Sequence, residues 1–415
     1  MLTGRDGKAR SLILLEVSDR ELAESFLTRA VGRTRRSSYL GTPIRAYGNL
    51  ATAFIGDYLL IGELSNVRAA IDVQKGGAPS LAASPPFRRS RALLPNEDRL
   101  IFGYGTREGL RRVLRNQPGV FGRLTRLADD PDLLGASVAA RAEKKGLWIN
   151  YGGALRTDRF RARIQEDRPF TPKLHQAVPG DSVAFLDMWG ADRLAETVTD
   201  IAGGGTKLSD LLGGLGSDLS GSNRAQIRRA LRPLNGREAA LFLSPSGRSP
   251  LLTLVVDGVR SGEAAKMIEQ LQPLIAKVVE RPASGQVPIF EPTRVGNRDA
   301  VTLSISPSID LTFSAYGGRA VISTAPAGIR KLDQSQSKIA DNEFFRTGTQ
   351  GRLDRVTSVL FLDLEQFFAL GEQAGLQASA SFRAFRSALS RVSTVSAVTS
   401  STRAGKTATI FIEVP

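Results

Sequence analysis

The 415-residue sequence contains no cysteine and only one histidine, His175. Without cysteine, disulfides, thiolate metal ligands and cysteine nucleophiles are excluded. With one histidine, His-rich metal sites and Ser-His-Asp catalysis are nearly excluded as well, so we expect His175 to be a linker or packing residue. We therefore assign no catalytic, cofactor-binding or metal-binding residue from the sequence.

Long apolar runs are also missing. No stretch of about 18 apolar residues occurs, so no segment is predicted to span a membrane. The first ten residues are polar and do not form a signal peptide. Aromatic residues make up 7% of the chain. No aromatic stacking platform interleaves with the basic residues, so no specific nucleic-acid binding is expected.

Positive charge, by contrast, is in excess. The net charge is +15, and residues 1–170 hold 29 Lys and Arg against 18 Asp and Glu, whereas residues 171–415 hold 27 against 23. Most of the excess is arginine, which suits phosphate or carboxylate surfaces. The alternative is codon composition, since alanine, glycine and arginine are all abundant in GC-rich genomes.

One arginine group is a candidate anion-binding surface. Arg107, Arg111 and Arg115 have the helical spacing i, i+4 and i+8 and so share one helix face. The other members lie beside them or in the segment that follows. The group comprises Arg107, Arg111, Arg112, Arg115, Arg156, Arg159, Arg161 and Arg163. Together they would suit anionic lipid headgroups or an envelope polymer. The alternative is a solvated arginine-rich face.

The chain also repeats itself at long range. Phe54–Ile61 has a counterpart 261 positions later in Ala315–Ile322, and Leu100–Tyr104 has one 259 positions later in Val359–Asp363. Such a long period indicates duplicated domains, because solenoid repeats are usually about 20–50 residues long.

Two kinds of unit make up each repeat. An outer unit has a short apolar strand, one or two helices and a closing hairpin, whereas an inner unit has a helix, short strands and a second helix. Their order is inner, outer, outer, inner, outer. We predict a first domain over residues 1–170 that lacks its opening outer unit, and a complete second domain over 171–415. The missing unit indicates that Met1 is an internal start or that a longer precursor has lost its N-terminal part.

Helix starts and faces can be predicted within this scheme. Ser18 to Glu21 reads as a capping box, and Leu22, Phe26 and Ala30 then line one apolar helical face. Ser65 is predicted to cap a helix over residues 65–73, and Pro326 to open another.

Asp187 and Asp363 end equivalent strands ahead of helices. A helix-capping role is the simpler interpretation, and paired carboxylates for acid–base work or cation binding are the alternative.

The predicted fold class is α+β, with two tandem homologous domains. Each domain would have an antiparallel sheet covered by helices on one side, because strands such as Leu50–Ile55 alternate between apolar and polar residues.

Several strand motifs are similar to those of a family of bacterial proteins, domain of unknown function 3352. They are VPGDSVAFLDMWG at 178–190, GDYLLIGELSNVRAAID at 56–72 and LLPNEDRLIFGYG at 93–105. The resemblance implies an extracytoplasmic protein, often with an N-terminal membrane anchor that this chain lacks. It implies no activity, cofactor or catalytic residue.

The resulting hypothesis is a non-catalytic binding or scaffolding protein of the bacterial cell envelope, engaging an anionic or lipidic partner through its arginine-rich first domain. Two alternatives stay open. One is an enzyme that acts through carboxylates such as Asp187 and Asp363, and the other is a cytosolic nucleic-acid-binding protein driven by the net charge.

Overall fold

The computed structural model describes residues 2–3, 9–31, 34–114, 130–158, 167–191, 193–194, 234–247, 250–279, 290–306 and 309–414. Within these ranges the strands form antiparallel sheets of two, five and thirteen strands, interspersed with helices. The α+β prediction is therefore confirmed.

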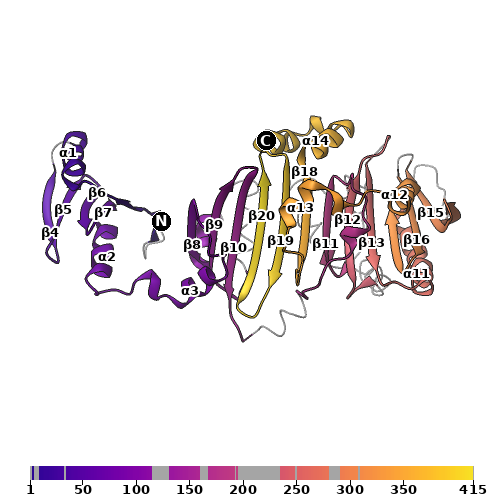
Figure 1. Ribbon diagram of the computed structural model, residues 1–415, viewed down its shortest axis with the longest axis horizontal. Coiled ribbons are helices and arrows are strands. Elements are labelled where there is room, and N and C mark those ends of the chain that lie inside the picture. Colours follow the sequence, from indigo (N-terminus) through magenta and orange to yellow (C-terminus); the bar gives the residue numbers. More distant parts are fainter. Residues whose placement is uncertain are drawn as a thin grey trace. The chain divides into compact units, whose positions relative to one another are not determined.

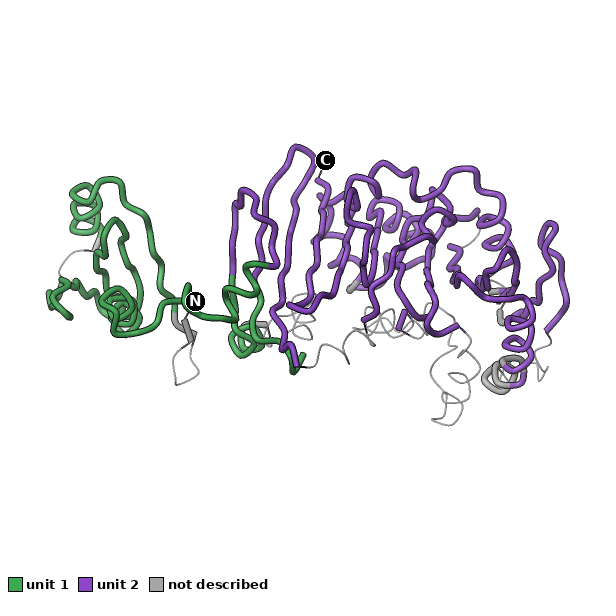
Figure 2. The backbone as a smooth tube through the Cα atoms, turned by 60° about the horizontal axis from the view of Figure 1, so that its bottom comes forward, with its two compact units in different colours: residues 1–92, 104–136 green, residues 93–103, 137–415 purple. Residues whose placement is uncertain are grey.

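The chain divides into two compact units, coloured separately in Figure 2. The first comprises residues 1–92 and 104–136, and the second comprises residues 93–103 and 137–415. This division follows spatial contacts rather than sequence repeats, so the predicted repeat domains 1–170 and 171–415 stay a prediction.

The first unit is built on the five-stranded sheet, in the order β3-β7-β6-β5-β4. Its core consists of side chains from β5, β6, β7 and α2, such as Ile44, Leu60, Val67 and Ile71, each at most 1% exposed. The elements of residues 1–114 are β1 (Leu2–Thr3), β2 (Ala9–Arg10), β3 (Leu12–Glu16), α1 (Arg20–Val31), β4 (Arg35–Tyr39), β5 (Thr42–Tyr47), β6 (Leu50–Ile55), β7 (Tyr58–Glu63), α2 (Leu64–Gln74), η1 (Leu81–Ala83), α3 (Pro85–Ala92), β8 (Ile101–Thr106) and α4 (Arg107–Leu114).

The thirteen-stranded sheet runs in the order β14-β15-β16-β17-β13-β12-β11-β18-β19-β20-β10-β9-β8. The remaining elements are β9 (Leu133–Glu143), β10 (Gly146–Leu155), η2 (Leu174–Gln176), β11 (Ala184–Trp189), β12 (Glu238–Ser244), β13 (Leu251–Asp257), α11 (Ser261–Val279), β14 (Phe290–Val295), β15 (Arg298–Ser306), β16 (Ile309–Tyr316), β17 (Arg319–Ser323), α12 (Pro326–Gln334), η4 (Ile339–Asp341), α13 (Glu343–Thr349), β18 (Ser358–Asp363), α14 (Leu364–Gln373), η5 (Leu376–Ala378), α15 (Ala380–Ala388), β19 (Thr394–Ser401) and β20 (Gly405–Glu413).

Aromatic side chains fill the middle of this sheet on one face. Phe242, Phe185 and Phe361 are cross-strand neighbours on β12, β11 and β18. Phe345 of α13 packs edge-on against Phe185 and Phe361. All four rings are at most 1% exposed, so this row anchors α13 to the sheet.

Helices cover both faces of the sheet. Successive strand residues point to opposite faces, and Val255 packs with α12 and α13 whereas its neighbour Val256 packs with α11. Figure 1 shows α12 and α13 lying over the strands. The expectation of helices on one side only is therefore wrong for this sheet, because its central strands are apolar on both faces and need cover on both.

Two glycines let the helices approach the sheet closely. A Cβ on Gly328 of α12 would meet the hydroxyls of Ser323 and Thr253, and one on Gly348 of α13 would meet Ser396. The sheet residues below these glycines are small, so the backbone of each helix lies close to the sheet.

Several local predictions hold and others do not. The hairpins β9–β10, β12–β13 and β19–β20 form as predicted, and Pro326 does open α12. Asp19 rather than Ser18 caps α1, because its carboxylate accepts the N–H of Leu22. Helix α2 starts one residue before Ser65, so Glu63 rather than Ser65 is its N-cap residue, and Glu63 makes no side-chain cap hydrogen bond.

Candidate functional site

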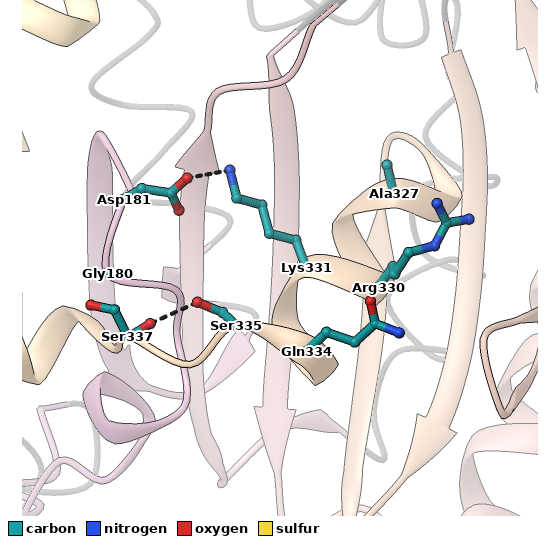
Figure 3. A pocket seen from close by; sticks show the side chains of 8 residues that line it. All are labelled: Gly180, Asp181, Ala327, Arg330, Lys331, Gln334, Ser335 and Ser337. Carbon is teal, nitrogen blue, oxygen red and sulfur yellow. Dashed lines mark hydrogen bonds and ion pairs between the residues drawn. The ribbon is translucent and has the colours of Figure 1, made fainter.

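An open recess of about 590 Å³ lies beside α12. It lies between that helix and the turn that precedes β11 (Figure 3). Its lining residues are Gly180, Asp181, Ala327, Arg330, Lys331, Gln334, Ser335 and Ser337. All but Gly180 and Ala327 carry a polar side chain, and the aliphatic stems of these chains supply apolar surface beside the polar ends.

Backbone hydrogen bonds fix the two walls of the pocket to each other. The N–H of Gly180 donates to the carbonyl of Ser337 at 2.9 Å, and the N–H of Ile339 donates to the carbonyl of Val178 at 2.9 Å. The Ser335 hydroxyl donates to the same Ser337 carbonyl at 2.7 Å. A Cβ on Gly180 would meet the Ser337 hydroxyl and the Lys338 carbonyl, so a larger residue would force this wall to shift. The backbone therefore holds the two walls of the pocket together.

The two adjacent cations of α12 differ in their surroundings. Lys331 forms an ion pair with Asp181 at 2.5 Å and also donates to the carbonyl of Pro245 at 2.8 Å. Arg330 is exposed and makes no hydrogen bond or ion pair with the described residues. In Figure 3 its guanidinium lies away from Asp181. One positive charge in the pocket thus stays uncompensated, which favours an anionic group.

Sequence reasoning missed this pocket. The sequence analysis includes Gly180 and Asp181 only within the motif at 178–190, and it contains no role for Arg330 or Lys331. No signal in the sequence joins the two segments, because more than 140 residues separate them along the chain. The isolated bridge between Pro179 and Lys338 brings them together only in the folded chain.

The predicted arginine surface is assembled only in part. Arg107, Arg111 and Arg112 share α4; Arg107 and Arg111 are half-buried and already have interaction partners, whereas Arg112 is exposed. Arg156 follows β10 and forms an exposed ion pair with Asp158 at 3.2 Å. The other members lie outside the described residues: Arg115, Arg159, Arg161 and Arg163. The predicted surface stays a prediction.

Asp187 and Asp363 play different roles. The Asp363 carboxylate caps α14 by accepting the N–H of Gln366 at 2.9 Å, as predicted. Asp187 instead lies inside β11 and does not cap a helix, so that interpretation was wrong for it. Strand β11 continues beyond Asp187 to Trp189, which pairs with Glu238, because the strand is held on both sides by β12 and β18.

The two aspartates do not form a pair. Strands β11 and β18 are antiparallel, and Asp187 pairs with Val359, four positions from Asp363, a spacing of roughly 13 Å along the strand. A shared proton or a shared cation needs carboxylates a few ångströms apart. The paired-carboxylate hypothesis therefore does not apply to these two residues.

Asp187 is a buried acid that lies beside Glu238. Its side chain is 0% exposed, and neither carboxylate oxygen has a hydrogen-bond partner with good geometry among the described residues. Burial raises the pKa of Asp187 well above its ordinary value, followed by the charge of Glu238, a hydrogen-bonding interaction with that same carboxyl and the charge of Asp257. The group is therefore kept neutral in the interior.

Glu238, next to Asp187 on the same face, has a clear structural role. Its carboxylate accepts the backbone N–H groups of Lys173 at 2.5 Å and Leu174 at 2.7 Å. It thereby fastens the segment before β11 to the sheet. Charge-assisted hydrogen bonds of this kind are the strong ones.

His175 packs against Phe345, with ring centroids 5.9 Å apart, and burial lowers its pKa. The packing interpretation is thus confirmed. In the described ranges, no three His, Asp or Glu side chains are placed to hold a metal ion. Among the helices that the structure describes, none is both long and apolar enough to cross a bilayer.

Comparison with protein families assigns the chain. The family model described as Protein of unknown function (DUF3352) matches residues 5–413, nearly the whole sequence. The chain therefore belongs to this family, and the resemblance inferred from its strand motifs is confirmed. Neither the curated proteins nor the solved structures contain a match.

Proposed function

We propose that this protein is a non-catalytic binding protein of the bacterial cell envelope that holds an anionic group in the pocket beside α12. The observation that carries the proposal is the guanidinium of Arg330, which is exposed at this pocket and has no acidic partner among the described residues. A free guanidinium presents several donors in a planar fork and matches phosphate or carboxylate oxygens.

The surroundings of Arg330 support an anion rather than a neutral ligand. Lys331 and Asp181 offset each other, so the charge of Arg330 dominates the lining. Gln334 and Ser337 also line the pocket and add side-chain donors, with Ser337 on the wall near Gly180 (Figure 3). The volume of about 590 Å³ leaves room for a charged group together with the organic body that carries it.

The envelope location is part of the proposal. It is supported by the family resemblance, which implies extracytoplasmic proteins, and by the positive charge of residues 1–170, which suits anionic lipids or polymers. Cell fractionation followed by peptide mapping of the native N-terminus tests it. Recovery of the protein in the cytosol only would overturn this part.

The binding function is tested with glycerol 3-phosphate as the probe, in calorimetric titrations at low ionic strength. We expect Arg330→Ala to weaken binding by about tenfold to a hundredfold, because one charge-assisted hydrogen bond is worth roughly 1.5–3 kcal/mol. Arg391→Ala is the matched control, since Arg391 is also exposed and lies in the turn before β19, outside the pocket. Equal affinities of the two variants, or no measurable binding by the unchanged protein, would refute the proposal.

A further inference from the structure

Strand β3 is the outermost strand of its five-stranded sheet, and its free edge is apolar. It pairs with β7 on one side, and no other described strand pairs with it. Ile13, Leu14 and Leu15 are 52%, 54% and 46% exposed. Side chains on both faces of the strand are thus in water, which is unusual for three consecutive apolar residues in a sheet.

The second repeat shows what this position looks like when it is covered. The pairing of β3 with β7 matches that of β13 with β17, so Leu14 corresponds to Val255 and Leu15 to Val256. Val255 and Val256 are 0% and 1% exposed. The difference does not come from residue type, because all four side chains are aliphatic.

The helix that follows shows the same contrast. Both β3 and β13 are followed by a helix after three residues, which places Phe26 of α1 at the position of Met267 of α11. Phe26 is 63% exposed, whereas Met267 is 2% exposed. The apolar face predicted for α1 at Leu22 and Phe26 therefore has no described cover.

Strand β12 and its neighbours provide the cover in the second repeat. Strand β12 pairs with β13 from Ala239 to Ser244. Ala239 of β12, together with Leu234 and Ala191, belongs to the same buried cluster as Val256 and Met267. An equivalent of β12 beside β3 would bury the corresponding residues of the first unit.

The short pairing of β1 with β2 points to where such a strand comes from. Leu2 pairs with Arg10 and Thr3 with Ala9, in the antiparallel sense, and β2 leads directly into β3. If this register continues, the five residues that directly precede Met1 lie opposite Leu12–Glu16. The β1–β2 pair is then the tip of a hairpin equivalent to β12–β13.

From these observations we infer that the edge of β3 is an intramolecular docking site, filled by a β-strand that precedes Met1 in the same polypeptide. That strand pairs antiparallel with β3 and buries Leu14, Leu15 and Phe26. Its residues correspond to Glu238–Phe242 of β12, so it is predominantly apolar.

A designed extension tests the register directly. The full chain is prepared with Glu-Ala-Ala-Leu-Phe, the sequence of residues 238–242, fused in front of Met1. We expect amide hydrogen exchange at residues 12–16 to slow by about tenfold or more, because the outer edge of β3 becomes hydrogen-bonded. A control chain has one serine inserted after the extension; this shifts the register by one residue and turns the apolar side chains to the wrong faces.

Three outcomes overturn the inference. Equal exchange in the extended, control and unextended chains means that the edge does not accept a strand. Dimerisation of the unextended chain with protection of residues 12–16 means that a second copy fills the edge, which light scattering detects. A native protein whose N-terminal peptide begins at Met1 would have no preceding segment to supply the strand. The inference is supported if amide exchange at residues 12–16 slows in the extended chain and if Leu14→Lys removes this slowing. Leu14 is exposed until the strand docks, so the lysine would disturb only the docked state.

Discussion

Two aspartates at equivalent sequence positions show how far single residues can be interpreted from the chain alone. The motif of apolar residues followed by aspartate predicts a cap, and Asp363 is one. Asp187 has the same local sequence but stays inside a strand, because β11 is extended by its pairing with Glu238 on β12. Strand ends depend on the partner strands, which lie more than 50 residues away, so the sequence pattern could not separate the two cases.

Asp187→Asn is expected to stabilise the protein at neutral pH. The pKa of Asp187 is raised above its ordinary value of 3.8, mainly by burial. An acid of this kind contributes most to stability below its unfolded pKa, and the free energy of unfolding falls as the pH rises towards the folded pKa. Each unit by which the pKa is raised costs about 1.4 kcal/mol at neutral pH.

Urea unfolding of both proteins between pH 3 and pH 8 measures this effect. The variant should be the more stable one at pH 7, and the two curves should converge near pH 3. A constant difference across the pH range would contradict the protonated state of Asp187. Glu238→Gln serves as the contrast, since it weakens the hydrogen bonds from Lys173 and Leu174 and should destabilise the protein.

At the scale of the elements, the strands and hairpins with strong apolar patterns could be predicted, and the polar ones could not. Strand β4 reads Arg-Arg-Ser-Ser-Tyr and was missed, as was β14, which contains Pro292. Both are outermost strands of their sheets, where polar residues and proline are tolerated. The pocket beside α12 was also missed, because its two walls come from distant segments.

Gly328→Ala is expected to destabilise the docking of α12 by about 1 kcal/mol or more, since the new methyl group would displace the hydrogen-bonded hydroxyls of Thr253 and Ser323. Gly262→Ala is the control: Gly262 is also in a helix, but an added Cβ meets nothing within 4 Å. That control should leave stability unchanged or slightly raise it. Thermal unfolding of the two variants decides, and equal midpoints would refute tight packing at Gly328.

For the whole molecule, the two compact units suggest two unfolding steps. The core of the first unit is small and its β3 edge is exposed, so we expect residues 9–92 to unfold at lower urea than the second unit. Leu60→Ala should lower only the first step, by roughly 2–5 kcal/mol, and Phe361→Ala only the second.

Pulse-labelling hydrogen exchange with mass spectrometry across a urea series follows the two units separately. If both variants shift one common transition, the two compact units unfold together, and the prediction of two unfolding steps is wrong.

The pairing of β10 with β20 has a consequence for biosynthesis. Ala154 pairs with Gly405, so the partner of β10 is translated about 250 residues after β10 itself. At about 5–20 residues per second, β10 is without its partner strand β20 for about 12 to 50 s during translation. During this interval the nascent chain presents a bare template for mispairing, and its yield in cells should depend on chaperones that shield it until β20 is made.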